Sequence, residues 1–167
     1  LHVGPQLVRG DSPLADVGSA YNAIRVVGDA IGRAWFHGMG AGQMPTASAV
    51  VADLVDIAQG GWELDINSNN NNKLEASDSK KASRYYRLQV NDEPGAIAKI
   101  SSLFGDKNIS IDAMIQHEAK SKENLESVPV VFITGEITDK EAVKLKNALE
   151  DLPEVIPGVK KFRVHLG

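Results

Sequence analysis

Three closely spaced glycines, Gly38, Gly40 and Gly42, precede a segment whose apolar residues recur at helical spacing. Glycine lets the backbone approach a ligand closely, and the N-terminus of a helix presents free N–H groups and the positive end of a dipole. That combination suits a phosphate group. The dinucleotide fingerprint is incomplete, because Gln43 and Pro45 stand where its third glycine would be. The residues alone therefore leave a phosphate-facing loop and a tight strand-to-helix turn as two open interpretations.

The segment Asn91-Asp92-Glu93-Pro94-Gly95 forms a second turn before an expected helix. Amides at the start of that helix could hold the carboxylate of a small ligand. Asp92 could accept a hydrogen bond from an ammonium group, and Pro94 stiffens the turn without loss of a helical hydrogen bond. The alternative is that Asp92 simply caps the helix.

Residue patterns for catalysis and for metal binding are missing from this sequence. Its four histidines have no metal-ligand spacing, no serine lies in a nucleophile elbow, and there is no cysteine. Residues 1–72 contain no lysine, which excludes any mechanism that needs a lysine acid in that half. We therefore assign no catalytic residue and no metal site.

The elements that must position the second turn follow one another in the order β-α-β-β-α-β. Tyr86, Leu88 and Val90 share one face of a strand, and Thr138 and Glu141 have the spacing of a helix capping box. Alternation and helical stripes predict strands over 86–90, 109–115, 128–134 and 162–166, with helices after Gly95 and Thr138. This order is typical of a ferredoxin-like α+β fold, with a four-stranded antiparallel sheet and both helices on one face.

The elements around the glycine loop are a β-hairpin and a helix. Two β-prone runs, Asn22–Val27 and Ala30–Phe36, are joined by Gly28-Asp29 and predict the hairpin. Apolar residues at helical spacing predict the helix over Thr46–Ala58, and Gly60-Gly61 end it.

Composition indicates the class of protein and the place where the chain divides into two parts. With 43% hydrophobic and 24% charged residues and a net charge of −4, the 167 residues predict a globular protein that binds neither nucleic acid nor membrane. The Asn-rich, apolar-poor stretch 66–83 predicts a flexible linker between residues 1–65 and 84–167. The start lacks Met and any signal-peptide pattern, so we expect a cytoplasmic piece of a longer chain.

Two segments resemble a known pair of modules. The sequence of residues 22–29, 36–42 and 45–54, which includes Phe36-His37-Gly38-Met39-Gly40-Ala41-Gly42, resembles the closing segment of the homoserine dehydrogenase catalytic region. Residues 86–100, continuing to Ile109-Ser110-Ile111 and Gln116, resemble an ACT domain, an amino-acid-sensing module with the ferredoxin-like order. In this sequence order the pair resembles the C-terminal part of a monofunctional homoserine dehydrogenase.

The resemblance implies an enzyme of threonine, methionine and isoleucine biosynthesis that interconverts aspartate semialdehyde and homoserine with NADP or NAD. In that family a Gly-Ala-Gly turn contacts the cofactor, a role that falls here on Gly42 first, with Gly40 and Ala41 beside it. His37 replaces a tyrosine usual in relatives. The family's Rossmann fingerprint and catalytic lysine have no counterpart, so we expect this fragment alone to be inactive. The alternative is a non-catalytic amino-acid-binding ACT module.

The resemblance also implies an effector, which in this family would be threonine, and a homo-oligomer formed through the ACT domain. We expect the effector near the turn after the first strand, closed by residues of a neighbouring subunit. The residues so assigned are Asn91, Asp92, Gly95, Ala96 and Ile97, with Asn108 or Ile109 from the neighbour. We expect coupling to work through dimer geometry and domain docking, because a flexible linker transmits little force.

Overall fold

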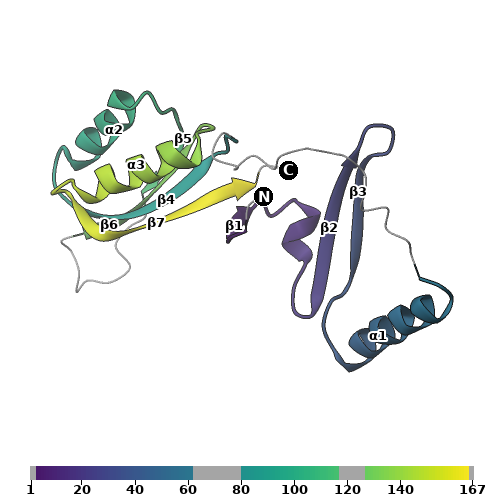
Figure 1. Ribbon diagram of the computed structural model, residues 1–167. Helices are drawn as coiled ribbons and strands as arrows, with labels where there is room; N and C mark the ends of the chain where they lie inside the picture. Colours follow the sequence, from purple (N-terminus) through teal and green to yellow (C-terminus); the bar gives the residue numbers. More distant parts are fainter. Residues whose placement is uncertain (1–2, 62–79, 117–126, 166–167) are drawn as a thin grey trace. The chain divides into compact units, whose positions relative to one another are not determined.

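The computed structural model describes residues 3–61, 80–116 and 127–165, which form two compact units (Figure 1). The first unit holds residues 10–61, and the second unit holds residues 3–9 together with those from 80 onward. Most of the predicted linker, residues 66–79, lies outside the described residues. None of the helices in the described ranges combines the length and apolar character that a membrane crossing needs.

The second unit confirms the predicted ferredoxin-like α+β fold. Its strands lie in the order β1-β7-β4-β6-β5, where β1 is Gln6–Val8, and β7, β4, β6 and β5 are antiparallel neighbours. Both helices cover one face of this sheet (Figure 1). The elements from β4 onward are β4 (Arg84–Asn91), α2 (Ala96–Asp106), β5 (Ile111–Gln116), β6 (Ser127–Thr134), α3 (Asp139–Glu150) and β7 (Val155–His165).

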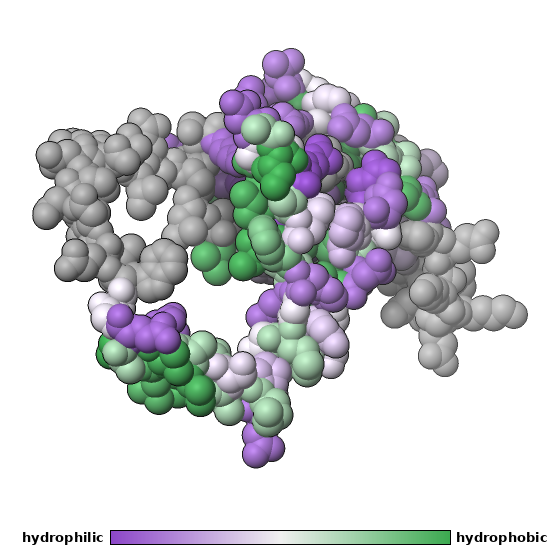
Figure 2. All heavy atoms as spheres, turned by 90° about the vertical axis from the view of Figure 1, so that its right-hand side faces the viewer, coloured by the Kyte–Doolittle hydropathy of each residue, from purple (hydrophilic) through white to green (hydrophobic). Residues whose placement is uncertain are grey.

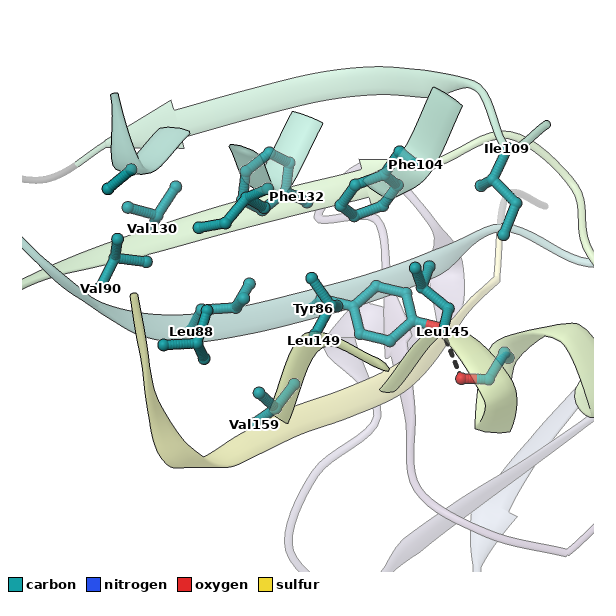
Figure 3. Close-up of a cluster of buried hydrophobic side chains, with 14 of the residues drawn as sticks. Tyr86, Leu88, Val90, Phe104, Ile109, Val130, Phe132, Leu145, Leu149 and Val159 are labelled. Atoms are coloured by element: carbon teal, nitrogen blue, oxygen red, sulfur yellow. Dashed lines mark hydrogen bonds between the residues drawn. The ribbon is translucent and has the colours of Figure 1, made fainter. Parts of the chain in front are cut away.

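Its core lies between the sheet and the two helices (Figure 3). Tyr86, Leu88 and Val90 are buried on one face of β4, as the alternation predicts. The Tyr86 hydroxyl donates to the Ala142 carbonyl of α3 at 2.9 Å (Figure 3), which satisfies a polar group that burial would otherwise leave unpaired. The predicted capping box of Thr138 and Glu141 is present at the start of α3.

Two strands of this sheet differ from the sequence prediction. β7 begins at Val155, well before the predicted residue 162, and carries a bulge around Gly158, whose φ is +110°. β5 begins at Ile111, two residues after the predicted start, because the Ile109 amide donates to the Phe104 carbonyl of α2 at 2.9 Å and not to a neighbouring strand. Leu166, which was assigned to the last strand, lies outside the described residues.

β1 (Gln6–Val8) is a fifth strand that sequence analysis did not anticipate. It runs parallel to β7 at the edge of the sheet, with Leu7 opposite Val164. Residues at the end of the predicted linker also contact this unit, since Ala82 and Ile137 exchange backbone hydrogen bonds of 3.0 Å. The second unit therefore includes residues that precede the first unit in the sequence and residues that follow it.

The first unit contains a short 3-10 helix, the predicted hairpin and the predicted helix. The hairpin turn is displaced from Gly28-Asp29, because Gly28 pairs with Gly32 and residues 29–31 form the loop. The helix begins at Gln43, three residues before the predicted start. These elements are η1 (Pro13–Asp16), β2 (Tyr21–Gly28), β3 (Gly32–Met39) and α1 (Gln43–Ala58).

The helix α1 has no buried residue. Its exposed apolar side chains include Val50, Val51, Leu54 and Ile57, and that of Ile57 is 71% exposed. Figure 2 shows a hydrophobic patch low in the view, at the height of α1 in Figure 1. Apolar surface of this kind is typical of a segment that packs against further protein.

Candidate functional sites

The glycine loop joins β3 to α1 and has the geometry of a tight turn. The Gly40 amide donates to the Ala20 carbonyl at 2.8 Å. A Cβ at Gly40 would lie 1.8 Å from the Asn22 Nδ2 atom, so a larger residue here would require the exposed Asn22 side chain to move. Gly42 is the N-cap of α1 with a φ of +121°, a backbone conformation that side chains disfavour. The fold alone therefore explains the glycine at position 42.

The same loop suits the phosphates of a dinucleotide cofactor. Gly40, Ala41 and Gly42 are exposed, and the 16-residue helix α1 begins directly after them. Its first N–H groups have no partner within the helix, and the helix dipole favours a negative group at this end. These backbone groups could hold the pyrophosphate of NAD or NADP.

The second site is the turn between β4 and α2. The Asn91 amide donates to the Glu154 carbonyl at 2.9 Å, and the Asn91 side-chain amide donates to the Pro153 carbonyl at 3.3 Å. Both bonds hold the end of β4 against the segment that precedes β7. Asp92, Glu93, Pro94 and Gly95 then project as an exposed turn.

Asp92 does not cap α2. The N-cap is Gly95, with a φ of +91° and no side-chain hydrogen bond to the helix. The capping interpretation of Asp92 is therefore wrong. Its exposed carboxylate lies in the turn before the first amides of α2. A carboxylate next to helix N-terminal amides provides complementary partners for the ammonium and carboxylate groups of an amino acid.

An ion pair that sequence analysis missed lies beside this turn. Lys99 of α2 donates to the carboxylate of Glu154, a residue that is 7% exposed. The hydrogen bond from Lys99 lowers the pKa of Glu154, and the same contact raises the pKa of Lys99. Nothing in the local sequence points to this pair, because 55 positions separate its members.

The predicted effector residues separate into two groups in one chain. Asn91, Asp92, Gly95, Ala96 and Ile97 lie together at the start of α2. Asn108 and Ile109 follow the other end of this helix, which is about 16 Å long at its 11 residues. The Ile109 side chain is also buried in the core of its own unit. A ligand at the turn could therefore meet Asn108 only from another copy, and the buried Ile109 side chain is not exposed for such a contact.

Comparison with known proteins matches a family to each of two parts of the chain. The family profile of homoserine dehydrogenase matches residues 1–55, and that of the ACT domain matches residues 87–151. The chain is a homoserine dehydrogenase relative with an ACT domain. The resemblance to the C-terminal part of this family is thus confirmed.

Individual relatives match along almost the whole chain. The homoserine dehydrogenase of Pseudomonas aeruginosa is 31% identical over 98% of this chain and 40% of its own length. That of Mycobacterium bovis is 36% identical over 94% of this chain and 36% of its own length. A solved homoserine dehydrogenase from Thiobacillus denitrificans has a TM-score of 0.78 and 31% identity, covering 96% of this chain and 38% of its own. The chain spans about 40% of the length of such relatives.

Proposed function

We propose that this chain is the C-terminal part of a cytoplasmic homoserine dehydrogenase that interconverts aspartate semialdehyde and homoserine with NADP or NAD. The observation that carries the proposal is the succession of a dehydrogenase match and an ACT match, in relatives that align with nearly the whole chain. When bound, the cofactor supplies hydride transfer. Gly40, Ala41 and Gly42 orient its pyrophosphate at the start of α1.

The ACT domain in this proposal binds threonine at the turn between β4 and α2. Amides at the start of α2 receive the carboxylate, and Asp92 receives the ammonium group. Threonine then inhibits the enzyme by binding one of its conformations better than the other, since equal affinity for both shifts nothing.

Two copies of the second unit associate through β5 in this proposal. One edge of the sheet is occupied, because β1 pairs with β7 there. The opposite edge is β5, where Met114 and Ile115 are 46% and 48% exposed. An edge strand with exposed apolar side chains is a template for pairing with another strand.

The alternative proposal is a non-catalytic amino-acid-binding module. It is favoured by one observation, that the positive φ at Gly42 explains this glycine without a cofactor. Under this alternative the turn between β4 and α2 still binds an amino acid, and the glycine loop has only a structural role.

An assay of the complete gene product separates the two proposals. We expect homoserine-dependent reduction of NADP or NAD, followed by absorbance at 340 nm, and inhibition of this reaction by threonine. Absence of homoserine oxidation with either cofactor would favour the non-catalytic module. If homoserine is oxidised and threonine does not change the rate, the result would support dehydrogenase activity and exclude threonine as the effector.

A further inference from the structure

The chain enters the first unit directly after β1. Residues 3–9 belong to the second unit, and residue 10 begins the first. β1 pairs with the edge of the ACT sheet, yet it lies within the residues that the homoserine dehydrogenase profile matches. A strand from the dehydrogenase-like region thus completes the sheet of the sensing domain. We call residues 6–8 with their partners 163–165 the β1 clasp.

Two adjacent strands connect the proposed effector turn with the β1 clasp. At the turn, Asn91 of β4 donates its amide to Glu154, the residue before β7, and Val90 pairs with Val155. At the other end of the same strands, Arg84 of β4 pairs with Arg163, and Arg163 pairs with Gln6 of β1. The effector turn and the clasp therefore lie at opposite ends of one β4–β7 ladder.

Two part-buried ion pairs fix the clasp end of this ladder. One Asp139 oxygen accepts from Arg84 Nη2 at 2.7 Å, and the other accepts from Arg163 Nη2 at 2.6 Å. Asp139 is the first residue of α3, so this contact joins β4, β7 and α3 next to β1. Movement of β7 against β4 at this end would disturb both ion pairs as well as the pairing of β1.

β1 itself is held weakly. It has three residues, of which Gln6 and Leu7 are exposed, and it contributes none of the buried core residues. A short edge strand of this kind can separate from the sheet while the core stays folded. The structure shows the paired state, and an open state of this strand would supply the second of the two arrangements that transmission between sites requires.

We propose that pairing of the β1 clasp is coupled to occupancy of the effector turn at Asn91–Ile97. Effector binding orders the turn and the β4–β7 ladder, strengthens the pairing of β1, and so acts on the dehydrogenase-like unit through the junction at Arg9-Gly10. This inference rests on the proposed function and adds a route within one chain to the coupling expected from dimer geometry. Linkage makes the effect reciprocal, so an open clasp weakens effector binding.

Hydrogen exchange of the whole chain with and without L-threonine tests this coupling directly. We expect exchange at residues 6–8 to slow when threonine binds. Leu7→Pro and Val8→Pro, made singly, each remove one backbone N–H from β1, whereas Leu7→Ala keeps it and serves as the control. We expect at least one proline variant to raise the threonine Kd about fivefold or more, and Leu7→Ala to change it less than twofold.

The outcomes separate this inference from the proposed function. Threonine binding with unchanged exchange at residues 6–8, and wild-type affinity in both proline variants, would overturn the coupling and leave threonine sensing intact. Absence of threonine binding to the wild-type chain would overturn threonine sensing and the coupling together. The exchange measurement on the wild-type chain decides the question even if a proline variant fails to fold.

Discussion

Tyr86 shows how one buried hydroxyl ties the sheet to a helix and makes stability depend on pH. Its side chain is completely buried and donates to Ala142 of α3. Burial raises the pKa of Tyr86, because the phenolate would lie in an apolar core. In the unfolded chain the same group titrates near pH 10, at about its ordinary value.

The sign of the resulting pH dependence follows from which state loses the proton first. Below about pH 10 both states keep it, so the contribution of Tyr86 is fully present. Above about pH 10 the unfolded chain ionises while the folded chain stays neutral, which lowers the free energy of unfolding by about 1.4 kcal/mol per pH unit. Tyr86→Phe removes this dependence and, with the lost hydrogen bond, costs about 1 kcal/mol at pH 8.

Urea unfolding of wild type and Tyr86→Phe at pH 8, 10 and 11 measures this effect. We expect the stability advantage of the wild type to shrink from pH 10 to pH 11. A constant difference between the two proteins across this range would contradict the account of Tyr86.

Asp139 balances the charges of one buried and one part-buried guanidinium group. The Arg84 side chain is 1% exposed and that of Arg163 is 11% exposed, and both pair with this one carboxylate. Asp139→Asn leaves the guanidinium charges of Arg84 and Arg163 without this carboxylate. We expect a loss of about 3 kcal/mol, at the low end of the range for buried pairs because Asp139 itself is 30% exposed. Asp106→Asn, at an exposed position of α2, is the control and should change thermal stability little.

The glycine loop allows a matched pair of substitutions in the complete gene product. Gly42→Ala strains a backbone with a φ of +121° at the proposed cofactor loop, whereas Gly38→Ala places its Cβ in open space. We expect the KM for NADP or NAD to rise about tenfold or more in Gly42→Ala, which corresponds to about 1.4 kcal/mol, and to stay near wild type in Gly38→Ala. Equal KM values in both variants would argue against cofactor contact at Gly42.

At the scale of elements, the open edge strand β5 gives the prediction on assembly. Ile115→Lys places a charge on this edge and should shift the chain toward monomer, because edge lysines prevent strand pairing. Val143→Lys, at a position of α3 with the same 48% exposure, should not. Light scattering measures the mass of both variants. Each variant also carries Leu54→Glu, which removes an exposed apolar side chain of α1 and so weakens any association through that helix. An unchanged mass in Ile115→Lys would place the interface elsewhere.

Elements with a strong periodic signal could be predicted from the sequence. The buried face of β4 and the capping box of α3 are local patterns, and the structure contains both. β1 could not be predicted, since three residues show no period and their partners are more than 150 positions away. The predicted position of the turn between β2 and β3 is wrong, because Gly28 and Gly32 both suit a turn. Pairing between the two strands decides the register, and the sequence does not display it.

The candidate sites were predictable to a similar degree. The turn from Asn91 to Gly95 and the loop from Gly40 to Gly42 stand out locally through glycine and proline. Lys99 and Glu154 do not, because their ion pair exists only when α2 packs beside the segment before β7. Long-range contacts of this kind depend on tertiary structure, which a single sequence does not display.

At the scale of the whole molecule, the two units share one polypeptide but differ in how they are stabilised. The second unit has a continuous buried core, whereas α1 of the first unit exposes its apolar side chains. In our proposal the remainder of the dehydrogenase covers α1, and the second unit acts as its sensor. Regulation of the enzyme in this proposal therefore depends on amino-acid binding by the second unit.

Calorimetric titration of the chain with L-threonine tests this central claim most directly. We predict saturable binding of one threonine per chain, no comparable binding of serine, isoleucine or methionine, and a loss of affinity of about tenfold or more in Asp92→Ala. Glu93→Ala, at the neighbouring exposed carboxylate, is the matched control and should bind threonine like the wild type. Absence of saturable heat with threonine, or equal affinity of Asp92→Ala and wild type, would contradict threonine sensing at this turn.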